Sequence, residues 1–234
     1  MEVALAPISP EGLRPALAPV GWTRLEVALR EGRETLRGRT VWMVNSTAVG
    51  GGVAELIRGV LPYARGAGLD LRWVVIQARP AFFRLTKRIH NRLHGYPGDG
   101  GELGGRERRL YETALGPSAA WLKRRVRTGD VVVLHDPQTI GLARALTTRG
   151  ATVVLRSHVG ADRPNAFVRA AEDFLQPYGA DADAVVFSRH SDRAPRLGDA
   201  HVAVIAPCID PCGTKNRELD DARARAILCR AGLA

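Results

Sequence analysis

Four short apolar runs of the sequence each end at polar residues that can bind a sugar hydroxyl or an anion. The residues after these runs are, in chain order, Asn45 and Ser46, His135 and Asp136, Arg156 and His158, and Ser188 and Arg189. In an open α/β sheet, ligands bind outside the carboxyl ends of the strands, where the loops converge. If the four runs are parallel strands, these side chains lie at one edge of the sheet and form one candidate site.

Three consecutive glycines, Gly50, Gly51 and Gly52, stand between the first run and a helical pattern that begins near Val53. Glycine adopts positive φ readily and lets a ligand approach the backbone, while the N–H groups of a helix N-terminus favour an anion or a hydroxyl-rich ligand. The stretch lacks the G-x-G-x-x-G of dinucleotide sites, and no P-loop Lys-Ser/Thr follows it, which disfavours a dinucleotide-dependent enzyme and an NTPase. A tight turn without a ligand is the alternative.

His158 and the neighbours His135 and Asp136 have the most chemistry available to them. A neutral imidazole at position 158 can hydrogen-bond a reacting sugar or stabilise developing charge, and a histidine satisfied within the fold is the alternative. His135 and Asp136 can bind sugar hydroxyls or cap the helix that Pro137 is suited to open. As metal ligands this pair lacks a third partner at a useful spacing, so we expect no metal site.

A second set of polar residues lies on a predicted helix at 81–95. Lys87, His90, Asn91 and His94 are three or four residues apart along the chain and therefore share one helical face. This face either borders the site or is an ordinary exposed polar surface.

The elements that must position these residues alternate between strand and helix patterns. After an irregular stretch rich in proline (1–20) and a short amphipathic helix (22–38), runs rich in Val, Ile and Leu alternate with helical patterns. This alternation predicts a doubly wound α/β fold, with a mostly parallel, Rossmann-like sheet covered on both faces. The predicted strands lie at 39–46, 69–78, 130–136, 151–158, 183–188 and 201–207, and the later predicted helices at 52–68, 81–95, 106–127, 137–150, 165–179 and 218–234.

The 234 residues, 45% of them hydrophobic, suffice to bury a sizeable core. The formal net charge of +10 points to a polyanionic partner, yet nearly all the cations are arginines spread along the chain. They cluster only at 105–111 and 123–127. Because aromatic residues for base stacking do not alternate with these clusters, a nucleic-acid partner is disfavoured. Both clusters fall on the predicted helix 106–127, and its expected inward-facing residues are Leu110, Leu115, Trp121, Leu122 and Val126.

Cys208, Cys212 and Cys229 include no C-x-x-C pair, which argues against a disulfide framework and against a zinc site. The N-terminal residues, with an acid at position 2 and repeated prolines, do not resemble a signal peptide, and no run of about 18 apolar residues could cross a membrane. We therefore expect a cytoplasmic protein without a membrane partner.

Six longer motifs stand in a fixed order from about residue 39 to the end of the sequence: VWMVNSTAVGGGVAELI, FFRLTKRIHNRLHG, VVVLHDPQ, LRSHVGADRPN, VVFS and IAPCIDPCGTKNREL. In this order and spacing they resemble the retaining nucleotide-sugar glycosyltransferases of the trehalose-synthase type. The resemblance implies a GT-B architecture, in which two Rossmann-like domains face each other across a cleft. It also implies transfer of glucose from a nucleotide diphosphate donor to a sugar acceptor such as glucose, with no cofactor.

By this resemblance, His158 matches the active-site histidine that contacts the transferred sugar, and Gly50 to Gly52 lie beside the donor phosphates and the acceptor. Two positions depart from the family pattern: Gly160 stands where many members have Asp, and Cys208 stands where they have Ser. The positions that the resemblance and the strand ends assign to the acceptor pocket or the cleft are Asn45, Ser46, Lys87, His90, Asn91, His135, Asp136, Gln138 and Arg156.

The resemblance divides the chain into a lead-in with a helix (1–38), a Rossmann-like acceptor domain (39–206) and an interdomain linker with a helix (207–234). We expect the donor domain to be absent from these residues, so that a nucleotide sugar binds only when that domain is supplied and the residues alone are inactive. An uncovered cleft face would also allow a homodimer to form. The alternative function is a non-catalytic module whose basic helix binds an acidic partner.

Overall fold

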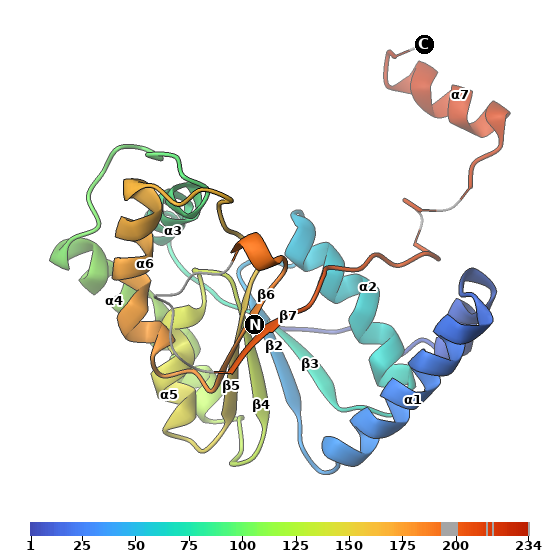
Figure 1. Cartoon of the computed structure of the whole chain (residues 1–234), viewed down its shortest axis with the longest axis horizontal. Helices are drawn as coiled ribbons and strands as arrows, with labels where there is room; N and C mark the ends of the chain where they lie inside the picture. The colour runs from blue at the N-terminus through green and yellow to red at the C-terminus, as the bar shows by residue number, and fades with distance from the viewer. Residues whose placement is uncertain (193–200, 214, 217, 234) are drawn as a thin grey trace.

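The computed structural model describes residues 1–192, 201–213, 215–216 and 218–233, so positions 214, 217 and 234 of the predicted linker and last helix lie outside the described residues. The described chain forms a 7-stranded sheet in the order β1-β3-β2-β4-β5-β6-β7. Every neighbouring pair is parallel except β1 with β3. Helices cover both faces of the sheet (Figure 1). The predicted doubly wound, mostly parallel α/β fold is therefore confirmed.

The strands β2 to β7 follow the predicted apolar runs, because β-branched residues fit a sheet that is buried on both faces. Trp42 and Val44 of β2 contribute to one core cluster, and Met43 packs against the other. The bounds are β2 (Val41–Asn45), β3 (Leu71–Val75), β4 (Val131–His135), β5 (Thr152–Ser157), β6 (Ala184–Phe187) and β7 (His201–Val204).

The helices lie near their predicted positions, with one exception described below. Helix α2 shows why they form: its buried residues Ala54, Ile57 and Leu61 recur at helical spacing and pack with Trp73 on one face of the sheet. The bounds are α1 (Pro19–Thr35), α2 (Gly52–Gly66), α3 (Pro80–Leu93), α4 (Gly105–Lys123), α5 (Ala143–Thr147), α6 (Ala166–Gly179) and α7 (Asp221–Arg230).

Two predictions of local structure were wrong. The stretch 1–20 is not wholly irregular, because β1 (Glu2–Val3) adds an antiparallel edge strand beside β3 and η1 (Pro10–Ala16) forms a 3-10 helix. The helix predicted at 137–150 is instead the short 3-10 helix η2 (Ile140–Leu142) followed by α5. The physical reason lies at Asp136, whose φ of 60° turns the chain sharply after β4. Pro137 therefore does not open a helix.

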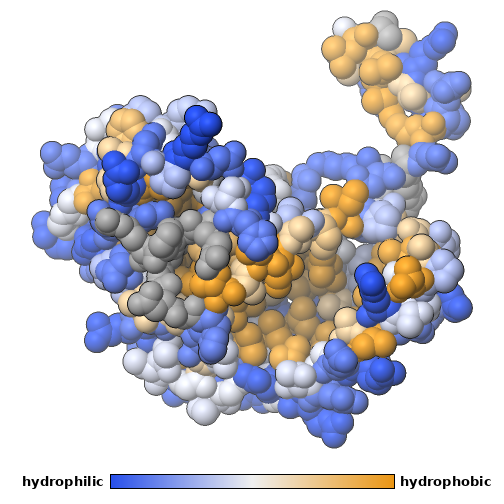
Figure 2. Space-filling model, viewed as in Figure 1, coloured by the Kyte–Doolittle hydropathy of each residue, from blue (hydrophilic) through white to orange (hydrophobic). Residues whose placement is uncertain are grey.

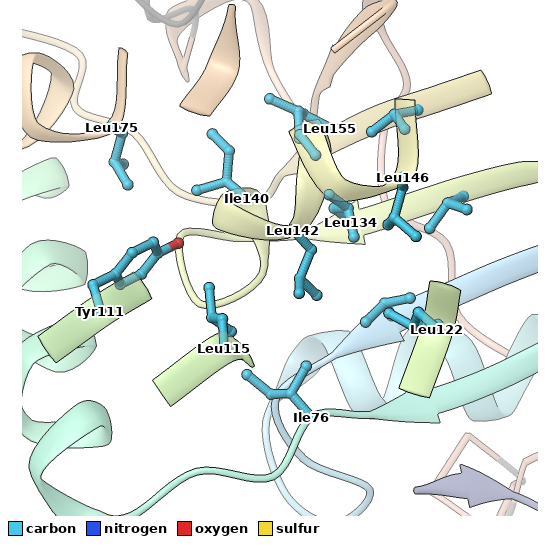
Figure 3. Packing of buried hydrophobic residues seen from close by; sticks show 14 of the residues in the cluster. Ile76, Tyr111, Leu115, Leu122, Leu134, Ile140, Leu142, Leu146, Leu155 and Leu175 are labelled. Atoms are coloured by element: carbon cyan, nitrogen blue, oxygen red, sulfur yellow. The ribbon is translucent and has the colours of Figure 1, made fainter. Parts of the chain in front are cut away.

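The larger core cluster lies between the sheet and the helices α3 to α6 (Figure 3). Tyr111 and Leu115 of α4 point into it, together with Leu142 of η2. The prediction that Leu110 faces inward was wrong, because Leu110 is 37% exposed and Tyr111 is fully buried in its place. The Tyr111 hydroxyl donates to the Pro137 carbonyl and accepts from the Gly141 N–H at 3.1 Å, which pins the turn after β4 to α4.

Beyond β7 the chain crosses α2 and leads to α7, which stands apart from the sheet (Figure 1). Asp210 accepts a hydrogen bond from the Tyr63 hydroxyl at 3.1 Å, and Lys215 pairs with Glu55, so this segment is fastened to α2 at two points. Helix α7 has no buried residue, and its apolar and hydrophilic side chains lie on opposite sides (Figure 2).

Candidate functional site

A pocket of about 850 Å³ opens beside the carboxyl ends of β4, β5 and β6. Its floor includes Asp136, His158 and Ser188, which follow these three strands. The N-terminal half of α2 and the C-terminal end of α3 form two walls, and residues from 207–213 and 215–216 form a third. The pocket therefore lies at the edge where the sequence predicted a site, at the position where ligands of open α/β sheets bind.

His158 is held from three directions by residues of the neighbouring strand ends. Its backbone N–H donates to Asp136 Oδ1 at 2.8 Å. Its ring Nε2 lies 3.0 Å from His135 Nδ1, and its Nδ1 lies 3.3 Å from Ser188 Oγ. The two imidazole rings are nearly parallel, at 7°, with centroids 5.3 Å apart. This arrangement fixes the orientation of His158 within the pocket floor.

Both histidines are neutral at pH 7. Burial lowers the pKa of His135 to about 3, and the proximity of His158 and Arg156 adds to this shift because each would repel a second positive charge. Burial and Arg156 lower the pKa of His158 to about 4. Because the shared hydrogen bond places one nitrogen of each ring against the other, a proton added to either ring has no acceptor between them. The pocket floor thus presents uncharged imidazole at neutral pH.

Asp136 combines a left-handed backbone with a buried carboxyl group. Asp is one of the residue types that tolerate φ near 60°. The Asp136 side chain does not cap a helix, since its carboxylate accepts from the His158 N–H. Burial raises the pKa of Asp136 to about 7, although that hydrogen bond and Arg156 oppose the shift. The carboxyl group is therefore part protonated at neutral pH and can donate as well as accept.

Asp136→Asn is expected to gain stability relative to the native chain as the pH rises. The pKa of Asp136 is about 7 in the folded state and about 3.9 in the unfolded state. Between these pH values the folded state binds more protons than the unfolded state, so the native chain loses stability as the pH rises. Asn keeps an acceptor for the His158 N–H and tolerates the backbone angle, but it carries no charge. Between pH 5 and pH 8, the difference in unfolding free energy should shift by about 1–3 kcal/mol in favour of the variant.

Urea unfolding of both proteins at the two pH values measures this shift. His135 and His158 have lowered pKa values, so they stabilise the fold increasingly as the pH rises toward 6.5, but they do so in both proteins and cancel in the difference. A difference that does not vary with pH would show that Asp136 is ionised throughout.

The glycine loop lies at the rim of the pocket. Gly50 and Gly51 have φ of 74° and 82°, which explains why glycine stands there. Gly52 lines the pocket, and an added Cβ at any of the three would meet no atom within 4 Å. The Arg58 guanidinium donates to the Ala48 carbonyl at 2.8 Å and holds the preceding turn. All three glycines are exposed, so the backbone of the loop is accessible just before α2.

On α3, the predicted polar face divides in two. His90 and His94 line the pocket, and their rings are 4.8 Å apart. Burial, with His94 and Lys87 nearby, lowers the pKa of His90, whose Nδ1 has no hydrogen-bond partner in the described structure. Lys87 is exposed and Asn91 half-buried, and neither contributes to the pocket wall.

Several predicted site residues lie behind the pocket or beside it. Asn45 is buried, accepting from Trp73 Nε1 at 2.8 Å and donating to the Thr47 carbonyl at 2.7 Å, so its side chain holds the strand end together. Arg156 donates to the Ile205 carbonyl at 2.7 Å and ties β5 to the end of β7. The predicted residues outside the pocket lining are Asn45, Ser46, Gly50, Gly51, Lys87, Asn91, His135, Gln138 and Arg156.

Sequence reasoning missed two parts of the lining. Asp192, at the end of the 3-10 helix η3 (His190–Asp192), is buried and binds the Arg189 guanidinium at 2.7 Å. Its only signal in the sequence is the i,i+3 spacing from Arg189, which directly follows the predicted strand 183–188. The second part belongs to the predicted linker and helix (207–234), of which Cys208, Asp210 and Lys215 line the pocket. Nothing in its composition indicates the fold onto α2.

Within the described ranges, no group of three or more His, Cys, Asp or Glu side chains is placed to hold a metal ion. None of the helices in that part of the chain has the length and apolar character that a bilayer-spanning segment needs.

Comparison with known proteins identifies the family. The family model described as trehalose synthase, N-terminal domain, matches residues 43–192. This chain belongs to the trehalose synthase N-terminal domain family. The trehalose synthases of Rubrobacter xylanophilus and Pyrococcus horikoshii are 35% and 31% identical over 88% and 86% of the chain. The chain spans about half the length of these relatives, 48% and 47% respectively.

Two solved structures share the fold of this chain. An α,α-trehalose 6-phosphate synthase from Burkholderia multivorans aligns with a TM-score of 0.54 at 15% identity, over 74% of this chain and 49% of that one. The UDP-forming α,α-trehalose-phosphate synthase from Burkholderia vietnamiensis gives 0.53 at 15% identity, over 72% and 48%. At this identity the likeness concerns the fold alone. The predicted membership of the trehalose-synthase type, with its Rossmann-like fold, is confirmed by the family match.

Proposed function

We propose that these residues form the acceptor-binding half of a glycosyltransferase that moves glucose from a nucleotide diphosphate sugar to a sugar acceptor such as glucose. The observation that carries the proposal is the meeting of three strand ends in one pocket around His158. The floor of this pocket carries little net charge at neutral pH, because its imidazole is uncharged and its carboxyl group is part protonated, and a floor of low charge suits an uncharged sugar.

Transfer requires more than this pocket. The donor and the acceptor must be held in line, and the charge of the departing diphosphate must be stabilised. The relatives are about twice as long as this chain, which supports the proposal that donor binding needs a second Rossmann-like domain, in the same polypeptide or in a partner. The glycine loop, whose backbone faces the rim, would then lie beside the diphosphate. We propose that the 234 residues alone bind acceptor but transfer no glucose.

Isothermal titration of the 234-residue protein with glucose, trehalose, ADP-glucose and UDP-glucose tests this function. We expect glucose or trehalose to bind and the nucleotide sugars to bind more weakly than they bind a full-length trehalose synthase. Transfer should be absent from the 234 residues and should return when a trehalose synthase donor domain is fused after residue 234. The absence of any sugar binding would reject the proposal, and transfer by the unfused protein would reject the need for a second domain.

His94→Ala is expected to weaken glucose binding by about 3- to 10-fold, the equivalent of one hydrogen bond. His94 is exposed on the pocket wall, so its removal should leave folding intact. Arg84→Ala is the matched control, since Arg84 is exposed on the same helix and does not line the pocket. Titration with glucose compares the variants, and equal losses in both would show that the α3 face does not contact the sugar.

A second candidate function rests on the exposed cations Lys123, Arg124 and Arg125 at the end of α4. Three adjacent positive charges there suit a non-catalytic module that binds an acidic partner. Retention on heparin that falls with salt, and that Arg124→Glu with Arg125→Glu abolishes, would support it. Retention that does not respond to salt would exclude it.

A further inference from the structure

A continuous hydrogen-bond chain crosses the ends of three strands beneath the pocket. It runs from His135 Nδ1 to His158 Nε2 over 3.0 Å, and from His158 Nδ1 to Ser188 Oγ over 3.3 Å. The Ser188 hydroxyl also reaches the Ser157 carbonyl at 3.5 Å. His135 and Ser188 are 2% and 8% exposed, so water does not compete for these contacts. These hydrogen bonds are therefore a fixed feature of the folded protein.

Only one donor-to-acceptor direction along these hydrogen bonds gives every donor an acceptor. If His135 Nδ1–H donates to His158 Nε2, then His158 Nδ1–H donates to Ser188, whose hydroxyl donates to Ser157. The atom left without a partner among the described residues is then His135 Nε2, as an acceptor. In the reverse direction His135 Nε2 carries a buried N–H without an acceptor, and a buried donor without a partner is the rarer and more costly arrangement. The first direction is favoured.

The same contacts determine which part of the His158 ring meets a ligand. Nδ1 and Nε2 both flank Cε1, so when both nitrogens bind protein groups, that edge of the ring points away from the pocket. His158 nevertheless lines the pocket. With both nitrogens engaged, the parts of the ring that remain for contact with a ligand are its carbon edge and its face. Its backbone N–H is also occupied, by Asp136. No N–H of His158 is left to donate to a sugar hydroxyl.

We propose that His135 and Ser188 are positioning residues that hold His158 as the single Nδ1–H tautomer, so that its ring shapes the sugar pocket without exchanging a proton with the sugar. The proposal rests on the function proposed above and sharpens it. The groups that exchange hydrogen bonds with the sugar are then Asp136, in the pocket floor, and the histidines of α3. The lowered pKa values of both buried histidines agree with a pair that stays neutral.

Long-range ¹H–¹⁵N NMR of the ¹⁵N-labelled protein at pH 7, without sugar, reads the tautomer directly. We expect His158 to be protonated at Nδ1 alone in the native chain. Ser188→Ala removes the acceptor for that proton, and His135→Leu removes the donor to Nε2, so both variants should give a mixture of tautomers. Ser188→Thr and His135→Asn keep a hydroxyl and a donor near the Nδ1 position, respectively, and should restore the single tautomer. Protonation at Nε2 in the native chain would overturn the proposal.

Glucose titration of the same variants tests the positioning role. Ser188→Ala and His135→Leu should weaken glucose binding by about 3- to 10-fold, and the two conservative variants should recover most of it. Ser188→Ala removes one oxygen atom and serves if His135→Leu does not fold. Unchanged affinity in Ser188→Ala would overturn the positioning role. If the native chain binds no sugar, the proposed function fails, whereas the tautomer measurement still decides whether His135 and Ser188 fix His158.

Discussion

Asp130→Ala is expected to lower the free energy of unfolding by about 3–5 kcal/mol, because it leaves three hydrogen-bond donors without an acceptor at the amino ends of the strands. Asp130 is 1% exposed and precedes β4. Its carboxylate accepts from the Thr40 N–H at 3.0 Å, from Trp42 Nε1 at 3.1 Å and from the Arg127 N–H at 2.9 Å. Asp130 thus joins the start of β2 to Arg127, which follows α4. Alanine supplies no acceptor for any of these three donors.

The pH dependence of Asp130 has a definite sign. Burial alone would raise its pKa, but the hydrogen bonds from Arg127, Thr40 and Trp42 outweigh burial and lower it. A depressed folded pKa means that the stabilisation is present above the unfolded pKa, about 3.9, and is lost as the pH falls through the folded value. The difference in unfolding free energy between the native chain and Asp130→Ala should therefore become smaller at acidic pH.

Urea unfolding at pH 7 and pH 3 measures both effects. Asp99→Ala is the control, because Asp99 pairs with Arg88 on the surface and its loss should change stability by about 1 kcal/mol or less. Asp130 lies at the edge of the sheet opposite the pocket, so the folded fraction of Asp130→Ala should bind glucose as the native chain does. A loss of unfolding free energy no larger than that of Asp99→Ala would show that water satisfies the three donors as well as the carboxylate does.

The sequence allowed the sheet to be predicted because each strand is specified locally. Runs such as Val131 to Leu134 are buried on one face and half-buried on the other, and the polar residue that follows marks the edge at which the chain turns. Parallel order then brings the ends of β4, β5 and β6 together. The strand ends alone therefore predict that His135, Asp136 and His158 lie close together.

The contacts within that neighbourhood depend on features that the sequence does not display. Whether His135 faces the pocket or lies behind His158 is decided by the register of β4 against β5, which pairs His135 with Arg156. The turn at Asp136 is a single residue in the left-handed region, and Asp is compatible with many other conformations. The contact of 207–213 with α2 depends on a hydrogen bond between Asp210 and Tyr63, which lies 147 positions earlier in the chain.

Gly160→Ala is expected to destabilise the fold by about 1–3 kcal/mol and to change the shape of the pocket. A Cβ at position 160 would lie 2.5 Å from Asp192 Cα and 2.7 Å from Asp192 Cβ, distances that real Cβ contacts do not reach. Because one of these atoms is backbone, a side-chain rotation cannot relieve the clash. The 3-10 helix η3 must move, and it carries Asp192 and the ion pair with Arg189 out of the pocket lining.

The same close approach gives a physical meaning to the glycine at this position. Any side chain at 160, including the aspartate that the family resemblance leads one to expect, would occupy space that Asp192 fills here. Gly160→Asp should therefore be at least as destabilising as Gly160→Ala. Gly116→Ala is the matched control: Gly116 lies within α4, an added Cβ meets nothing within 4 Å, and the change should stabilise the helix by up to about 1 kcal/mol. Thermal unfolding and glucose titration of the three variants test this account. A Gly160→Ala protein that is as stable as Gly116→Ala and binds glucose with native affinity would contradict it. In that case the backbone of η3 would have moved without any effect on Asp192.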